Sequence, residues 1–465
     1  MNLKYSIIPF FFLFAWIPVI AQNCNCTDEF LRVKDQITHN YAGFTDKVTS
    51  ATNKKYITHT QRILTATKQV TSPQHCALLI HNWLHFFKDR HIHFGENELS
   101  ASALQQIVSE TENIHLSQQQ LKALKLSKSI EGIYWNPDST YRIAIIKSTR
   151  PTREYAGVIL DSKRDSWKPG QVKLELNKAD KKNEVTGISY YGDHTPYIET
   201  FILTPPNAIG SWQREGTVPS NIGDVSGELV GGKLLSDKTL YLKIRSFDQE
   251  NAANIDSLLE TYKALLNKTP NLIIDVRDNG GGADFTYAHI TPYLYTNPVR
   301  KIGVDVLATE QNIKGWKPLL AMDDLPATLK KQIAEIIEHM EQHKGTFVSA
   351  AKDEIVTYDS ISTYPKKIAI LINSGCASTT EEFLMEAVQS KKVILLGEAT
   401  AGVLDYANVR EAPALPCLPY KLYYATTKSR RIKMGQGIDN VGLQPAVKLS
   451  RTENWITAAQ HLLEK

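Results

Sequence analysis

Two groups of residues could together carry out chemistry: a serine at a predicted strand-to-helix turn and a run of three glycines upstream of it. Ser378 follows an apolar run at residues 368–372 and precedes the sequence TTEEF, which predicts the start of a helix. Gly280, Gly281 and Gly282 follow a second apolar run at residues 272–276. Free N–H groups at a helix start and in a glycine turn favour negative charge. A hydroxyl beside both is suited to acyl transfer.

Each feature also has a purely structural interpretation. Serines at such turns commonly cap the helix that follows, and glycines after a strand commonly form a tight turn. Taken alone, either feature favours the structural interpretation. Their pairing in one α/β-patterned segment strengthens the catalytic interpretation, but the residue types leave both interpretations open.

The sequence NLIIDVRDNGGG at residues 271–282 resembles the glycine-rich signature of the C-terminal processing (tail-specific) and tricorn-core serine peptidases. Residues 371–381, LINSGCASTTE, and residues 397–402, GEATAG, resemble the nucleophile turn of that family and the strand and loop after it. The similarity extends over roughly residues 238–447. It implies an α/β, crotonase-like core with Ser378 as nucleophile. It also implies an oxyanion hole formed by the N–H of Thr379 and that of Gly281 or Gly282.

The loop after Gly402 departs from the tail-specific branch, in which a lysine activates the serine. Residues 403–406 read VLDY and contain no lysine, and Lys391 and Lys392 lie between the predicted helix and the next strand. A serine hydroxyl without a base is a weak nucleophile. Either the site is inactive or another group supplies the base.

The tricorn branch suggests which group that is, because it uses a histidine from an N-terminal helical segment and an acid near the C-terminus. The sequence FFKDRHIHF at residues 86–94 resembles its pattern of an acidic residue shortly before a histidine, which implies His91 as the base. The sequence GIDNVGLQP at residues 437–445 resembles the acid-bearing block, which implies Asp439. Imidazole, with a pKa near ~6.5, can accept the serine proton, and a carboxylate can hold its tautomer.

The histidines also permit a metal site as an alternative. His81, His85, His91 and His93 lie close together in the sequence with Asp89 among them, as zinc ligands can. The chain has neither an HExxH pattern nor a CxxC pair, and histidines on the rim of an amphipathic helix are the commoner explanation of His81 and His85. We therefore expect no metal and no other cofactor.

The N-terminus predicts export. Lys4 precedes an almost unbroken apolar stretch at residues 7–20, and Ala21 provides a small residue for cleavage. We expect a signal peptide over residues 1–21, a secreted or periplasmic protein, and no membrane span after cleavage. Cys24 and Cys26 are preceded by asparagines, which fit a lipid-anchor site poorly.

Composition excludes two classes of protein. Five cysteines in 465 residues are too few for a disulfide scaffold, although one bridge among Cys24, Cys26 and Cys76 is permitted. Cys376, beside the predicted nucleophile, is interpreted as a small packed residue. The net charge of +4 is not concentrated in a basic run, so nucleic acid is not an expected partner. The expected partner is a polypeptide substrate.

Patterns along the chain predict three sections after the signal peptide. Residues 22–126 are predicted to be largely helical, residues 127–235 to form a β-rich module, and residues 236–465 to form the α/β core. The module contains short β-type runs at residues 141–146, 156–160, 171–176 and 197–203. It lacks a glycine-rich carboxylate loop, so we do not expect it to bind peptide C-termini as a PDZ domain does.

The α/β core is predicted from repeated strand and helix patterns. Apolar strands are expected at residues 240–244, 272–276, 367–373 and 393–397, with helices between them. Buried strands alternating with helices favour a largely parallel sheet covered by helices. Residues 316–343 form an insertion that is interpreted as a lid or as packing.

Two functions remain. The first is a serine peptidase, and the second is a non-catalytic relative that binds a peptide or an apolar ligand. The absent lysine favours the second unless His91 meets Ser378, whereas the glycine and serine motifs favour the first. The distance between the His91 ring and Ser378 Oγ discriminates between them.

Overall fold

The computed structural model describes residues 25–97, 99–179, 183–204, 208–217, 228–323 and 325–465. The predicted signal peptide lies outside these residues. No helix in the described part of the chain is both long enough and apolar enough to cross a membrane.

A helical region begins the described chain. Its elements are α1 (Cys26–Asn40), α2 (Phe44–Lys47), α3 (Asn53–Thr67), α4 (Pro73–Leu84) and the short 3-10 helix η1 (His85–Phe87). The Asn25 side chain caps α1, and Ser72 caps α4, which has Pro73 in its first turn. A disulfide joins Cys26 on α1 to Cys76 on α4. The sequence left this pairing open among three cysteines.

The next section is a closed barrel, which follows α5 (Ala101–Ser109) and α6 (Gln118–Leu126). Its strands are β2 (Gly132–Trp135), β3 (Tyr141–Lys147), β4 (Tyr155–Ser162), β5 (Val172–Lys178), β6 (Glu184–Tyr190), β7 (Pro196–Thr204), β8 (Ala208–Ile209) and β9 (Trp212–Arg214). Alternate residues point inward, among them Ile143, Ile145, Leu174 and Leu176. A closed barrel has no open strand edge, the feature on which PDZ domains seat a peptide.

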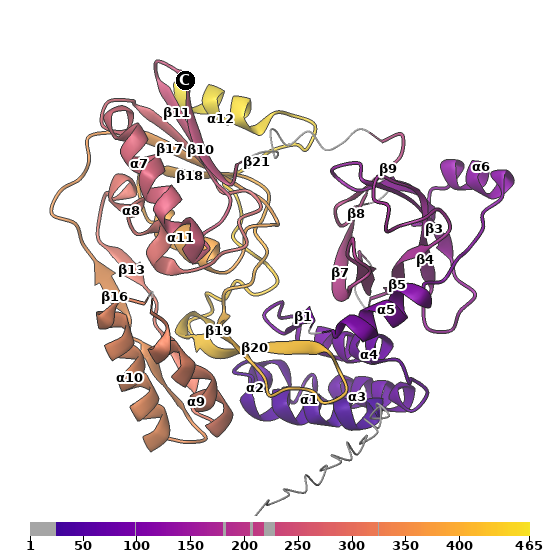
Figure 1. The fold of residues 1–465 in the computed structure, drawn as a ribbon. Coiled ribbons are helices and arrows are strands. Elements are labelled where there is room, and N and C mark those ends of the chain that lie inside the picture. Colours follow the sequence, from indigo (N-terminus) through magenta and orange to yellow (C-terminus); the bar gives the residue numbers. More distant parts are fainter. Residues whose placement is uncertain (1–24, 98, 180–182, 205–207, 218–227, 324) are drawn as a thin grey trace, which may run out of the picture.

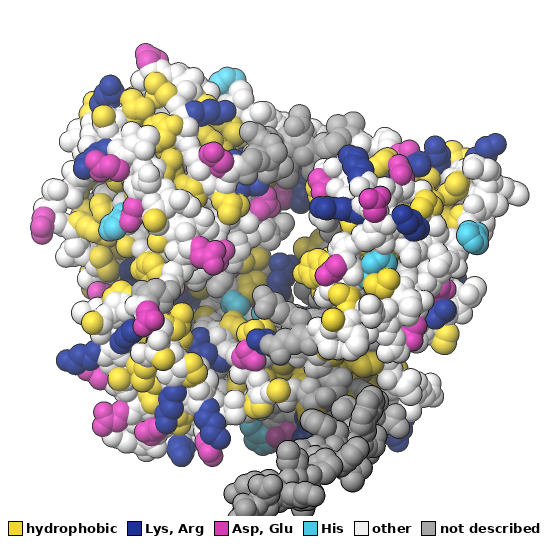
Figure 2. Space-filling model, viewed as in Figure 1, with side chains coloured by type: hydrophobic (Ala, Val, Ile, Leu, Met, Phe, Trp, Pro, Cys, Tyr) yellow, Lys and Arg dark blue, Asp and Glu magenta, His cyan; other side chains and the backbone are white. Residues whose placement is uncertain are grey.

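Figure 1 shows the barrel as a distinct unit of the chain. It contacts the rest of the protein through α4 and β1 (His93–Asn97). In the space-filling view the surface is hollowed between the barrel and the part of the chain that follows it (Figure 2).

A five-stranded antiparallel sheet covers the helical region. Strand order is β1, β20 (Tyr420–Ser429), β14 (Val304–Leu307), β15 (Phe347–Ala351), and β19 (Tyr406–Glu411) pairs with β20 as well. Leu422 and Tyr424 of β20 pack in the same core as Phe30 of α1 and Trp83 of α4. Beyond β14 and β15 lie α9 (Glu310–Trp316), η4 (Lys317–Ala321) and α10 (Ala327–Gln342). These helices pack on Val306 and Val348, so the predicted insertion is a packed layer.

A six-stranded sheet forms the remaining core. Strand order is β10 (Val230–Ser236), β11 (Thr239–Ile244), β12 (Asn271–Asp275), β17 (Lys367–Ile372), β18 (Val393–Gly397) and β21 (Val447–Lys448). All neighbours are parallel except β10 and β11. The connections include η2 (Gln249–Asn251), α7 (Ala252–Leu266), η3 (Asp284–Tyr287), α8 (Thr291–Leu294), the β13 (Val299–Lys301) and β16 (Glu354–Val356) pair, α11 (Thr379–Ala387), η5 (Arg430–Ile432) and α12 (Trp455–Glu464).

Helices cover both faces of this sheet, which explains its continuous apolar strands. On one face, Leu272 and Ile370 pack against α7 and α11. On the other, Ile273 and Leu371 pack against Trp455 of α12. Because side chains alternate between these two covered faces, every residue from Leu272 to Val276 is buried.

The mixed α/β class that the sequence predicts is confirmed, as are the four predicted core strands within one or two residues. The prediction of a helical segment up to residue 126 is wrong at β1. This strand forms by pairing with β20, more than three hundred residues away, so its local sequence carries little signal.

Candidate active site

Ser378 lies between β17 and α11, where it is the N-cap residue of the helix. Its φ is 54°, a left-handed value that costs a residue with a side chain roughly 1 to 3 kcal/mol. Its N–H donates to Val403 O at 3.1 Å and to Glu381 Oε2 at 3.2 Å. These bonds hold the turn in its strained form and leave the serine partly exposed.

Glu381, one turn along α11, binds the loop that follows β18. Its buried carboxylate accepts hydrogen bonds from the N–H of Gly402 at 2.8 Å and of Val403 at 2.7 Å, and from the Thr400 hydroxyl. Burial raises the pKa of Glu381, although these hydrogen bonds oppose the rise. The Glu381 carboxylate therefore holds the loop after β18, the loop in which tail-specific peptidases carry a lysine, next to the Ser378 turn.

The glycine turn after β12 lies directly against the serine turn. A Cβ on Gly281 would lie 3.0 Å from both Ser378 Cβ and Thr379 N, and a Cβ on Gly282 would lie 2.0 Å from Phe247 O. Both glycines also have positive φ values, 108° and 147°. Only glycine permits this approach and this backbone conformation.

The predicted oxyanion donors differ in how they are used. The Gly281 N–H donates to Asn279 Oδ1 at 3.0 Å. Within the described residues, the N–H groups of Gly282 and Thr379 have no hydrogen-bond partner. The Thr379 hydroxyl donates to Gly282 O at 2.9 Å and so joins the two turns. Two unpaired donors are thus present beside Ser378.

His91 reaches the serine from the other end of the chain. Its Nε2 lies 3.4 Å from Ser378 Oγ, across 287 residues of sequence. The histidine follows η1, which ends at Lys88 with a left-handed φ of 51°. The His91 backbone N–H donates to Asp89 Oδ1 at 2.9 Å, which fixes the turn that presents the ring.

Asp89 is the carboxylate beside the His91 ring, with 3.5 Å between Oδ1 and Nδ1. Burial would raise the pKa of Asp89, but hydrogen bonding and charge interaction with His91 and a hydrogen bond from Tyr41 lower it instead. The group is therefore an anion. A serine hydroxyl, an imidazole and a buried carboxylate thus lie in a row, although within the described residues His91 Nδ1 makes no hydrogen bond and contacts Asp89 only at the ion-pair distance.

Comparison with known proteins agrees with this geometry. Residues 238–449 match the model of peptidase family S41. The match covers a little under half of the chain and relates this segment to the S41 peptidases, which supports a serine-type peptidase. The segment contains Ser378, the glycine turn and Asp439, but neither Asp89 nor His91.

Solved structures resemble nearly the whole chain at low identity. Mature CPAF is 12% identical with a TM-score of 0.51, over 95% of this chain and 96% of that one. The photosystem II D1 C-terminal processing protease is 12% identical (TM-score 0.39, 95% and 98%), and the tricorn protease is 13% identical (0.41, 94% and 37%). At this identity the likeness to CPAF concerns the fold alone. No curated protein sequence matches the chain.

Asp439, the acid expected from the sequence, lies in the S41 segment but does not contact His91. Its carboxylate pairs with Lys47 and accepts from the Asn440 amide at 3.0 Å, and its N–H donates to Asp405 Oδ2 at 2.8 Å. Burial raises the pKa of Asp439 to about 6, although Lys47 opposes the rise. The carboxylate that the structure brings to His91 is that of Asp89.

Two other histidines of the predicted cluster bind the barrel. His81 Nε2 lies 3.0 Å and His85 Nε2 2.6 Å from Thr200 Oγ1 on β7. His93 stacks on Tyr423 of β20. In the part of the chain that the structure describes, no three His, Cys, Asp or Glu side chains are placed to hold a metal ion.

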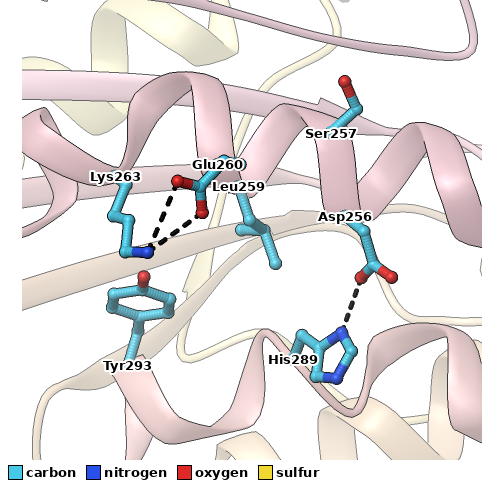
Figure 3. A pocket seen from close by; sticks show the side chains of 7 residues that line it. All are labelled: Asp256, Ser257, Leu259, Glu260, Lys263, His289 and Tyr293. Atoms are coloured by element: carbon cyan, nitrogen blue, oxygen red, sulfur yellow. Dashed lines mark hydrogen bonds and ion pairs between the residues drawn. The ribbon is translucent and has the colours of Figure 1, made fainter.

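A separate open depression of about 520 Å³ lies between α7 and the η3–α8 segment (Figure 3). Its exposed polar side chains pair with one another, His289 with Asp256 at 2.6 Å and Lys263 with Glu260 at 3.0 Å. Leu259 lies between these two pairs, and Tyr293 lies beside Lys263 (Figure 3). The depression therefore presents no unpaired charge to a ligand.

Sequence reasoning missed three residues of the site. Asp89 is signalled by its position two residues before His91, and Glu381 by the Ser-x-x-Glu spacing of a capping box. Tyr41, which donates to Asp89 Oδ2 at 2.8 Å, has no local signal, because its contact depends on how α1 packs.

Proposed function

We propose that this S41 protein hydrolyses peptide bonds through an acyl-enzyme on Ser378, with His91 as the general base. The observation that carries the proposal is the 3.4 Å separation of His91 Nε2 and Ser378 Oγ. It supplies a base where the lysine of tail-specific relatives is replaced by the apolar pair Val403 and Leu404. Hydrogen bonds of apo sites are often long and tighten when substrate binds.

In this mechanism His91 Nε2 takes the Ser378 proton as Oγ attacks the scissile carbonyl carbon. The negative charge that develops on the carbonyl oxygen is stabilised by the Thr379 N–H and a glycine N–H, with Gly282 the unpaired candidate and Gly281 the alternative. The imidazolium then gives its proton to the leaving amine. Water hydrolyses the acyl-enzyme by the same steps, again with His91 as base.

A carboxylate must hold the other side of the imidazole ring. We assign this role to Asp89, because its Oδ1 lies 3.5 Å from His91 Nδ1 and its pKa is lowered. Asp439, the acid that the sequence resemblance implies, is the second candidate. Its carboxylate interacts electrostatically with that of Asp89. It would need to leave Lys47 to contact the ring.

Two wider features belong to the same proposal. The S41 segment is proposed to have the crotonase-like fold, which the parallel sheet with helices on both faces supports. The protein is proposed to be secreted or periplasmic, without a lipid anchor. The N-terminal apolar stretch supports export, and so does the Cys26–Cys76 disulfide, since such bonds persist in oxidising compartments.

The test compares wild type with Ser378→Ala and with Ser374→Ala, a neighbouring exposed serine, on unfolded casein and with a fluorophosphonate probe. Wild type and Ser374→Ala should cleave casein and be labelled at Ser378. Ser378→Ala should be unlabelled, with hydrolysis reduced by at least ~10⁴-fold. Lactacystin, bound by mature CPAF in one structure, is a second probe of the same serine.

If folded wild-type protein neither reacts with the probe nor cleaves casein, the proposal fails. The non-catalytic alternative, a relative that binds a peptide or an apolar ligand, would then account for the site better.

A further inference from the structure

Tyr41 lies at the end of α1, far from the S41 segment in sequence, yet it contacts the site. Only 1% of its surface is exposed, and its hydroxyl donates to Asp89 Oδ2 at 2.8 Å. Its ring packs against Phe87 and Tyr406, with centroids 5.7 and 5.6 Å away. Burial, together with the charge of Asp89, raises the pKa of Tyr41 well above its usual range, so the hydroxyl remains a donor.

The two oxygens of Asp89 have different partners. Oδ1 faces His91, with the backbone N–H at 2.9 Å and Nδ1 at 3.5 Å, whereas Oδ2 accepts from Tyr41. A carboxylate held at one oxygen alone can rotate about its Cβ–Cγ bond. The bond from Tyr41 removes that freedom and directs Oδ1 toward the imidazole.

Three contacts fix Tyr41 itself. Its N–H donates to Ile37 O at 3.2 Å, and the next N–H, that of Ala42, donates to Ala425 O on β20 at 3.1 Å. The Cys26–Cys76 disulfide ties α1 to α4, the helix that leads to Asp89. The hydroxyl therefore has a defined position relative to the turn that carries His91.

Gly43 makes room for this arrangement. A Cβ at Gly43 would lie 2.3 Å from the Tyr41 hydroxyl oxygen and 2.4 Å from the ring carbon that bears it. The backbone at Gly43 has an ordinary φ of −89°, so alanine is conformationally acceptable there. The glycine is thus required by the tyrosine ring and not by the backbone.

We propose that Tyr41 is a positioning residue for the peptidase reaction: it holds Asp89 and, through Asp89, the His91 ring. The inference rests on the proposed function, and Tyr41 itself touches neither substrate nor the reacting atoms.

The test is Tyr41→Phe, with Tyr241→Phe as the matched control. Tyr241 lies on β11, in the six-stranded sheet. It is likewise buried, and its hydroxyl donates to an aspartate, Asp275 Oδ2, at 2.9 Å. Tyr41→Phe should lower kcat by about 10- to 100-fold with KM little changed, because the imidazole is less well placed. Tyr241→Phe should retain wild-type kcat, with a similar loss of Tm.

The pH profile separates positioning from a structural role. Without the tyrosine bond the Asp89 carboxylate is no longer held toward the imidazolium and stabilises it less, so the acid limb of kcat/KM should move to lower pH by ~0.5 unit. Gly43→Ala, which displaces the hydroxyl but keeps the tyrosine, should reproduce the loss of kcat. An active, folded Tyr41→Phe protein with wild-type kcat and pH profile overturns this inference alone. A folded wild type without activity overturns the proposed function and this inference together.

Discussion

The two halves of the site are built differently. The serine half is the six-stranded sheet with its Ser378 and Gly281–Gly282 turns, which apart from β10 lies within residues 238–449, where the S41 match lies. The histidine half is the helical region, residues 26–87, with the turn that carries Asp89 and His91 and the five-stranded sheet. Parallel neighbouring strands bring both turns of the serine half to one sheet edge. In the histidine half, the Cys26–Cys76 disulfide and the pairing of β1 with the distant strand β20 hold the elements together.

Under the proposed function, this difference means that the nucleophile and its oxyanion donors are encoded by short motifs, whereas the base depends on tertiary packing. A glycine turn and a strained serine need only their own strands to be in place. The His91 ring depends on α1, α4 and β20 together, through Tyr41, the disulfide and Ala425.

The largest expected effect distinguishes the two candidate carboxylates, one in each half. Asp89→Asn should lower kcat/KM by ~10²–10⁴-fold, because an amide cannot stabilise the imidazolium or hold its tautomer. Asp439→Asn should lower it by less than about tenfold, since its partners are Lys47 and Asn440. Steady-state kinetics on a fluorogenic peptide measure both. The reverse order of losses would return the role to Asp439.

An intermediate effect is expected from the disulfide of the histidine half. Replacing Cys26 and Cys76 with serine should lower the free energy of unfolding by about 2 to 4 kcal/mol. Hydrogen exchange should accelerate in α1 and α4 and stay unchanged in β12 and β17, because only the histidine half contains the bridge.

Cys417→Ser is the control for the disulfide variant, because it makes the same sulfur-to-oxygen exchange at a cysteine outside the Cys26–Cys76 bridge. It should keep wild-type exchange in all four elements. Equal acceleration in both halves of the Cys26→Ser/Cys76→Ser protein would show that they unfold as a single unit.

The smallest effect is expected from Glu381→Gln in the serine half. The amide would place N–H groups against backbone donors such as Gly402 and Val403, so the free energy of unfolding should fall by about 1 to 3 kcal/mol. kcat should fall because the Ser378 turn loses its support. Thermal denaturation and casein hydrolysis measure the two effects, with the exposed Glu260→Gln as control. Wild-type stability would mean that the loop is held in another way.

The serine half could be predicted from the sequence almost in full. Apolar runs, glycines and the TTEEF helix start are local signals, and the structure has β12, β17 and α11 where they indicate. The barrel strands β3, β4, β5 and β7 could likewise be predicted one by one. Their closure into a barrel could not, because it depends on pairings of short strands such as β8 and β9.

The histidine half could be predicted only in part. His91 is marked by a short motif. The choice between Asp89 and Asp439 depends on which of the two carboxylates pairs with Lys47, and in the structure that is Asp439. The five-stranded sheet gave no signal, since β1 and β14 are five and four residues long and gain stability from β20. Tyr41 resembles any buried tyrosine until α1 is docked.

The most direct test of the central claim, that a histidine outside the S41 segment activates Ser378, is the rate of fluorophosphonate labelling in His91→Ala. His93→Ala, which removes a ring stacked on Tyr423, is the matched control. Labelling of Ser378 in folded His91→Ala should slow by at least ~100-fold, while His93→Ala should be labelled within a few-fold of the wild-type rate. Labelling of folded His91→Ala at the wild-type rate would contradict the central claim.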